Sequence, residues 1–241
     1  MVCFLVAGCA TLSTDTERNA DDPLEPLNRA TFDANEALDS AIIRPIAEAY
    51  RKTVPEFIRD RIRSVIDNLA EPRIFVNDIL QGRFNAAGFT FARFVMNSTA
   101  GIGGMFDLAT GQGLPRQTGD FGETLYMWGA KDGPYVVLLF FGPSNVRDTI
   151  GLGVDLFTTP PALVVSGHAG TVTNFVVGTV DGVDLRARNI ETLDEIKASA
   201  LDQYTHMKSL MRQHRDAQLR AAKGLDEEPL ELSDPEATRI P

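Results

Sequence analysis

The sequence has little cysteine, no excess of basic residues and no long apolar run. Its two cysteines, Cys3 and Cys9, lie at the N-terminal end, so no disulfide can cross-link the rest of the 241-residue chain. A net charge of -10 argues against a nucleic-acid binder, which would present a basic face. The densest apolar run, Tyr135 to Phe141, is far shorter than the roughly 20 residues of a membrane-spanning helix.

Familiar catalytic motifs are also missing. The chain has no nucleotide P-loop, no Gly-x-Ser-x-Gly turn and no His-Glu-x-x-His helix. We therefore expect no catalytic residue, no metal site and no cofactor. Four aspartates could supply paired carboxylates for acid–base chemistry, but helix capping is the commoner role of aspartate at helix boundaries. They are Asp107, Asp120, Asp148 and Asp155.

The N-terminal residues resemble the signal and cleavage box of a bacterial lipoprotein. An apolar stretch and small residues precede Cys9, and Ala10 follows it. We expect residues 1–8 to be the remnant of a cleaved signal, Cys9 to be acylated, and residues 9–21 to form a polar tether. A folded domain is expected over residues 22–224, and the acidic tail 225–241 is expected to be disordered.

Most of the domain shows the periodicity of amphipathic helices, which predicts an all-α fold. Helices are expected over 27–42, 45–50, 57–69, 84–97 and 146–157, with a further one restarting at Pro72 and ending near Gly82. A capping box over Thr53–Glu56 is expected to open the third helix, and Ser144 to cap the helix from Val146. A long C-terminal helix is expected from Ile190 to about Ala222.

Three segments are ambiguous from their residues alone. Tyr135 to Phe141, bounded by Gly133-Pro134 and Gly142-Pro143, fits a buried strand or an apolar, lipid-facing lining. Residues 171–183 fit a helix or a strand, and residues 158–165 fit a loop or a hairpin. Arg147 fits either a local ion pair with Asp148 or a contact with a phosphate headgroup.

A series of short motifs, in order, resembles the MlaA/VacJ family of outer-membrane lipoproteins. Two positions depart from the usual pattern, Leu27 where the family often has Phe and Leu139 where it usually has Pro. The matching motifs are Asp22-Pro23-Leu24-Glu25-Pro26, Asn28-Arg29, Arg44-Pro45, Asn68-Leu69-Ala70-Glu71-Pro72, Asn77, Gln81-Gly82, Arg93-Phe94, Asn97-Ser98-Thr99-Ala100-Gly101, Asp107, Asp120-Phe121-Gly122-Glu123-Thr124-Leu125, Trp128-Gly129, Gly133-Pro134-Tyr135, Gly142-Pro143-Ser144 and Arg147-Asp148.

The resemblance implies a ring of amphipathic helices around an amphipathic channel, seated in the inner leaflet of the outer membrane. It also implies that Tyr135 to Phe141 is helical or irregular. Phospholipids misplaced in the outer leaflet would pass through the channel to a periplasmic carrier of the MlaC type, and a trimeric porin would be the membrane partner. Channel-lining candidates are Asn97, Thr99, Gly101, Asp107, Tyr135 and Arg147. The alternatives are a structural tether at the outer membrane or a lipoprotein phospholipase.

Overall fold

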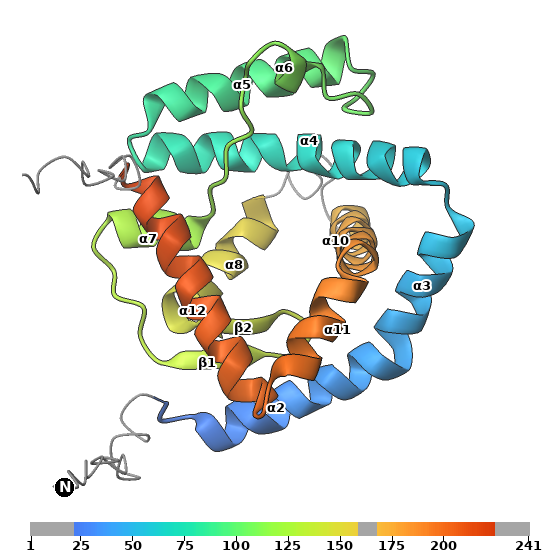
Figure 1. Cartoon of the computed structure of the whole chain (residues 1–241). Coiled ribbons are helices and arrows are strands. Elements are labelled where there is room, and N and C mark those ends of the chain that lie inside the picture. Colours follow the sequence, from blue (N-terminus) through green and yellow to red (C-terminus); the bar gives the residue numbers. More distant parts are fainter. Residues whose placement is uncertain (1–21, 159–167, 225–241) are drawn as a thin grey trace, which may run out of the picture.

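The computed structural model describes residues 22–158 and 168–224, which are mostly helical and form a ring (Figure 1). The predicted all-α, ring-like architecture is confirmed. Cys9, the expected tether over residues 9–21, residues 159–167 and the acidic tail 225–241 lie outside the described residues. The elements are α2 (Glu25–Leu38), the π-helix η1 (Asp39–Ile43), α3 (Arg44–Thr53), α4 (Glu56–Leu80), α5 (Phe84–Thr99), α6 (Leu108–Gly111), α7 (Phe121–Met127), β1 (Tyr135–Leu138), β2 (Gly142–Asn145), α8 (Val146–Thr158), α10 (His168–Arg188), α11 (Ile190–Ser199) and α12 (Gln203–Ala222).

The helices α2, α3 and α4 follow one another around the ring, and α5 and α6 lie on the outer side of α4 (Figure 1). On the side opposite α3, the ring is completed by α7 and α12, the β1–β2 hairpin lies beside α2, and α8 and α10 lie inside this frame. In the described part of the chain, no helix combines the length and the apolar character needed to cross a membrane.

Helix α4 runs through Pro72, so the predicted restart of the chain there is wrong. Proline removes one backbone hydrogen bond and clashes with the preceding turn. Polar links to α5 on both sides of Pro72 hold the helix together: Asn68 donates to Ser98 on one side, and Asp78 accepts from Thr90 on the other. Pairing with a neighbouring helix therefore outweighs the local penalty.

Three predicted helix boundaries are corrected by the structure. The capping box at residues 53–56 does not form, because α3 continues to Thr53 and Pro55 opens α4 without a side-chain cap. The cap of α8 is Asn145 and not Ser144, since the Asn145 Oδ1 accepts from the Asp148 amide at 2.8 Å. The helix predicted from Ile190 to Ala222 is divided into α11 and the longer α12, because the Asp202 side chain caps a new helix that begins at Gln203.

The segment after Pro134 forms the strand β1, which pairs with β2 in an antiparallel hairpin. The strand alternative read from the residues is correct for Tyr135–Leu138, and the helical or irregular conformation implied by the resemblance is wrong there. The other edge of β1 is paired with α2. Asn28 exchanges hydrogen bonds with the Tyr135 carbonyl and the Val137 amide. Residues 171–183 adopt the helical alternative, within α10.

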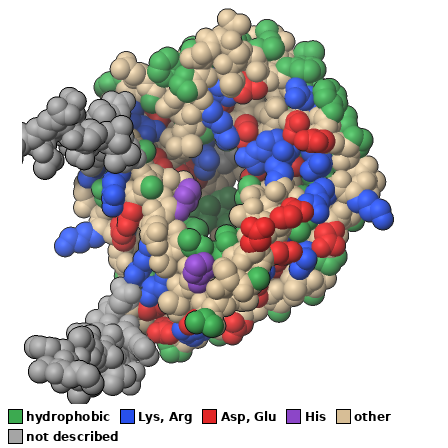
Figure 2. All heavy atoms as spheres, viewed as in Figure 1, with side chains coloured by type: hydrophobic (Ala, Val, Ile, Leu, Met, Phe, Trp, Pro, Cys, Tyr) green, Lys and Arg blue, Asp and Glu red, His purple; other side chains and the backbone are tan. Residues whose placement is uncertain are grey.

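The distribution of polarity is close to the reverse of that in a water-soluble domain. One small apolar cluster is buried, made of Phe32, Tyr135, Val137 and Tyr204 with Met207 against it. The largest fully buried side chains are polar or charged, and many large apolar side chains are exposed. The buried set is Arg93, Glu71, Asn28, Thr90, Thr124, Asp22, Asp78 and Asp184. Figure 2 shows apolar side chains along the upper and right-hand rim, and charged side chains around a central hollow.

Candidate functional site: a cavity inside the ring

A cavity of about 620 Å³ lies inside the ring, within the size range of ligand-binding pockets. Its wall is assembled from α4, the start of α7, the hairpin, α8 and α12. Its apolar lining residues are Leu138, Phe141, Pro143, Leu152 and Met211. Its charged lining residues are Arg73, Asp120, Asp132, Asp148, Asp155, Arg212, Arg215 and Asp216. The cavity is therefore amphipathic.

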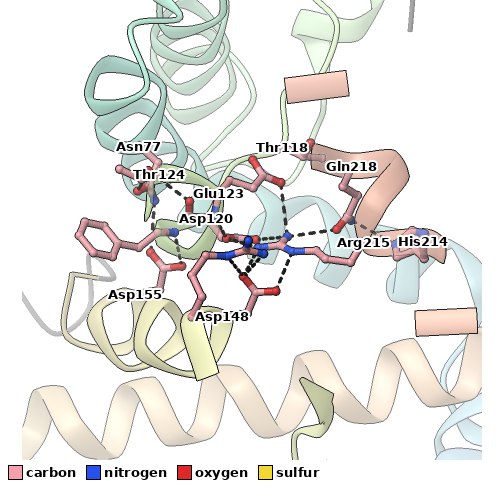
Figure 3. Close-up of polar contacts among 12 residues, drawn as sticks. Asn77, Thr118, Asp120, Glu123, Thr124, Asp148, Asp155, His214, Arg215 and Gln218 are labelled. Carbon is pink, nitrogen blue, oxygen red and sulfur yellow. Dashed lines mark hydrogen bonds and ion pairs between the residues drawn. The ribbon is translucent and has the colours of Figure 1, made fainter. Parts of the chain in front are cut away.

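Arg215 of α12 organises the charged wall. Its guanidinium donates to both oxygens of Asp120, at 2.7 and 2.8 Å, and to both oxygens of Asp148, at 3.0 Å each. Figure 3 shows Arg215 pointing between these two carboxylates. Asp120 caps α7 and Asp148 lies in the first turn of α8, so one side chain ties three helices together. Burial disfavours the charged guanidinium, but the two carboxylates outweigh this and raise the pKa of Arg215.

Glu123 lies directly behind this cluster. It is buried, and one of its oxygens lies 3.5 Å from the Arg215 Nη1 while the other has no hydrogen-bond partner among the described residues. Burial, reinforced by the charge of Asp120, raises the pKa of Glu123 to about 7. The cluster therefore contains one carboxyl group that titrates near neutral pH.

Arg73 of α4 lines the cavity beside Asp155 of α8. Its Nη1 lies 3.3 Å from the Asp155 Oδ2, and it makes no hydrogen bond to another described residue. Asp155 also accepts from the Phe121 amide at 3.0 Å and from Asn77 at 3.2 Å. Burial raises the pKa of Asp155, and the nearby Arg73 works against that shift. Most donors of Arg73 are thus available to a molecule in the cavity.

The six channel candidates predicted from the sequence do not come together. Tyr135 lines the cavity, where burial raises its pKa to about 12. Arg147 lies behind the wall, is 3% exposed, and forms the local ion pair with Asp148 at 2.9 Å as well as a contact with Asp132. Of the two alternatives for Arg147, the structure shows the ion pair.

The other four candidates belong to the turn between α5 and α6. Asn97 donates to Asp107 and accepts from two amides of α6, while Arg93 donates to Asp107 at 3.1 Å. Burial would raise the pKa of Asp107, but hydrogen bonds from Thr110, Asn97 and Arg93 hold it at about 2. Gly101 is buried against backbone atoms of Phe106 and Asn97, and Thr99 is exposed at the end of α5. None of these four lines the 620 Å³ cavity.

The residues that organise the cavity wall, Arg73, Glu123 and Arg215, were not singled out from the sequence. Arg215 lies on the charged face of its helix, which resembles an ordinary solvated face. Its partners Asp120 and Asp148 are 95 and 67 residues away, so no local spacing connects them. The sequence signal that did exist was the position of Asp120 and Asp148 at two helix starts.

Comparison with known proteins settles the family. The model of the family described as MlaA lipoprotein matches residues 20–218. The chain belongs to the MlaA lipoprotein family.

Two named relatives and one solved structure are similar to most of the chain. It is 34% identical to the "Intermembrane phospholipid transport system lipoprotein MlaA" of Escherichia coli strain K12 over 217 residues, which cover 88% of this chain and 83% of the relative. The protein of the same name from Haemophilus influenzae is 30% identical, over 83% and 80% of the two chains. A chain from a structural study described as "Structural basis for maintenance of bacterial outer membrane lipid asymmetry" superposes with a TM-score of 0.71 and 32% identity, over 82% of this chain and 98% of that one.

Proposed function

We propose that this protein is a non-enzymatic lipid-transfer lipoprotein of the outer membrane. Acylated Cys9 would anchor it to the periplasmic side, and the ring would sit in the inner leaflet. Phospholipids misplaced in the outer leaflet would enter the ring and pass to a periplasmic carrier of the MlaC type, beside a trimeric porin. The names of the E. coli and H. influenzae relatives support a role in phospholipid transport. The similar solved structure comes from a study of outer-membrane lipid asymmetry, which supports a location at the outer membrane.

The observation that carries the proposal is the amphipathic cavity inside a ring with an apolar exterior. A phospholipid needs a polar surface for its phosphate, since a charge in a purely apolar passage is costly, and an apolar surface for its acyl chains. The cavity offers both kinds of group, since Arg73 and the Arg215 cluster line it together with Leu138, Leu152 and Met211. The exposed apolar side chains of the exterior, among them Phe84 and Phe91, suit contact with lipid.

The direct test is the amount of phospholipid exposed on the cell surface of a strain that lacks this protein. Surface phospholipid is expected to rise on deletion, to return to normal with the wild-type protein, and to stay high with Cys9→Ala. No rise in a strain without a second homologue would overturn transport and favour the tether. Release of lysophospholipid or fatty acid by the purified protein would instead indicate a phospholipase.

A matched pair of variants in α8 tests whether the cavity is the path. Leu152 lines the cavity, whereas Ile150, two residues earlier, is exposed and does not line it. Leu152→Asn is expected to leave the protein folded and to fail to lower surface phospholipid, because the apolar wall is interrupted. Ile150→Asn is expected to complement the deletion. Equal complementation by both would exclude this cavity as the path.

A further inference from the structure

The charged groups of the cavity are unevenly available to a ligand. Its lining contains five carboxylates, from Asp120, Asp132, Asp148, Asp155 and Asp216, against the three guanidinium groups of Arg73, Arg212 and Arg215. A fourth guanidinium, that of Arg147, lies behind the wall and pairs with Asp132 and Asp148. A site for an anion alone would have the opposite balance, because like charges repel a negative headgroup.

Arg215 has little capacity left for an added phosphate. Four of its hydrogen bonds go to Asp120 and Asp148, and a fifth goes to Gln218 at 3.2 Å. Displacing either carboxylate would leave a partly buried charge without its main partner, which is costly. A ligand phosphate at this cluster would therefore compete with two helix-start carboxylates.

Arg73 is the cavity cation with open donors. Its contact with Asp155 is a single pair at 3.3 Å, and Asp155 keeps the Phe121 amide and Asn77 as partners if Arg73 turns away. A guanidinium binds phosphate with two parallel hydrogen bonds, so Arg73 can take a phosphodiester while the Asp155 carboxylate keeps its hydrogen bonds from the Phe121 amide and Asn77.

Carboxylates on the more exposed part of the wall can receive a cation. Asp216 is exposed and has no hydrogen bond or ion pair with another described residue. One oxygen of Asp132 pairs with Arg147, but its side chain is 56% exposed, so its other oxygen can meet a ligand. An ammonium group carried by the ligand would meet these oxygens, whereas a second negative charge would face them.

We propose that the cavity selects phospholipids whose headgroup carries both a phosphate and an amine, with the phosphate at Arg73 and the ammonium near Asp132 and Asp216. The inference rests on the proposed lipid-transfer function and adds the headgroup class to it. A neutral zwitterion matches the open donors of Arg73 and the exposed carboxylates of Asp132 and Asp216. A headgroup with a net negative charge satisfies only the first.

The test measures which lipids the full-length protein extracts from vesicles. The vesicles contain equal amounts of phosphatidylethanolamine and phosphatidylglycerol with the same acyl chains, and mass spectrometry counts the lipid bound after separation. The wild type is expected to enrich phosphatidylethanolamine about tenfold, the ratio for one charge-assisted hydrogen bond. Equal uptake of the two lipids, or a preference for phosphatidylglycerol, overturns the inference while leaving transport standing. No uptake of either lipid contradicts both.

Variants then separate the two charges. Arg73→Gln is expected to lower uptake of both lipids about tenfold, and Arg73→Lys to retain part of it. Arg59→Gln on the same helix, away from the cavity lining, is expected to behave as the wild type. If Arg73→Gln fails to fold, the double variant Arg73→Gln/Asp155→Asn removes both charges of the pair. Its uptake of both lipids is also expected to fall about tenfold. Unchanged uptake in the folded variant overturns the role of Arg73.

The carboxylates are tested with Asp132→Asn/Asp216→Asn, which is expected to bring the two lipids to near-equal uptake by raising that of phosphatidylglycerol. A preference that stays tenfold contradicts the assignment of the ammonium. Soluble O-phosphoethanolamine has the same headgroup without acyl chains, and we expect it not to displace bound lipid at millimolar concentration. Full displacement would mean that the site takes a free phosphoamine and not a lipid.

Discussion

At the scale of single residues, two asparagines replace a missing strand. Asn28 and Asn35 lie two turns apart on one face of α2, about 10 Å along the helix. Asn28 pairs with the Tyr135 carbonyl and the Val137 amide, and Asn35 pairs with the Leu138 carbonyl and the Phe140 amide, three residues further along the hairpin. Three residues of a strand also span about 10 Å, so the spacing of the two asparagines along α2 matches the spacing of their partners along the hairpin.

Asn28→Ala is expected to lower the free energy of unfolding by about 2–4 kcal/mol, because a buried carbonyl and a buried amide lose their partners. Urea unfolding in detergent measures the change, with the exposed Asn85→Ala as the control. A loss no larger than that of the control would show that the hairpin does not depend on this pairing. Sequence analysis identified Asn28 only as part of a motif, because its two partners in the hairpin are more than 100 residues away.

Glu123 predicts a dependence of stability on pH. Its pKa in the folded protein is about 7, above its ordinary value of 4.5, so the folded state holds this proton more tightly than the unfolded state does. The stabilisation that protonated Glu123 provides is therefore lost as pH rises from about 4.5 to 7. Glu123→Gln is expected to match the wild type near pH 5 and to be more stable at pH 8, by about 1–3 kcal/mol. Unfolding midpoints over this range measure the difference, and parallel pH profiles of the two proteins would contradict it.

At the scale of elements, the crossing of α7 and α8 depends on glycine. A Cβ on Gly151 would lie 2.3 Å from the backbone nitrogen of Gly122, so α8 would have to shift. A Cβ on Gly153, in the same helix, would meet nothing within 4 Å. Gly151→Ala is expected to destabilise the protein by about 1–3 kcal/mol. Gly153→Ala is expected to be neutral or to stabilise it by up to about 1 kcal/mol, since alanine favours helix. Similar thermal midpoints for the two variants would contradict this close packing.

The helices were largely predictable, and their ends and partners were not. The 3.6-residue period placed α4, α5 and α8, because each has an apolar or small face that recurs along its length. The helix break predicted at Pro72 was wrong, because the links from Asn68 and Asp78 to α5 outweigh the local tendency of proline to end a helix. The break before α12 depends on Asp202, which also pairs with Arg29 at 2.8 Å. The ring was predicted from the family resemblance, as was the channel, because periodicity does not show how helices close into a ring.

At the scale of the molecule, polar groups hold the interior together and apolar groups face outward. Arg93 of α5 is 2% exposed and donates to Glu71 at 2.9 Å and to Asp107 at 3.1 Å. Phe91, two residues earlier on the same helix, is 55% exposed. In a water-soluble protein these two side chains would exchange places. Their positions fit an interior held by ion pairs and an exterior that contacts lipid.

Substitutions of Arg93 and Phe91 are therefore expected to have different effects on stability. Arg93→Met is expected to destabilise the protein by about 3–5 kcal/mol, because the Glu71 carboxylate stays buried without its main partner. Phe91→Ser is expected to leave the unfolding midpoint in detergent nearly unchanged and to weaken association with phospholipid vesicles, as apolar area leaves the lipid-facing surface. Vesicle flotation measures this association, and Cys9→Ala serves as the background so that the acyl anchor does not mask the effect. A destabilised Phe91→Ser, or a Phe91→Ser that floats as well as its parent, would mean that this face packs against protein and not lipid.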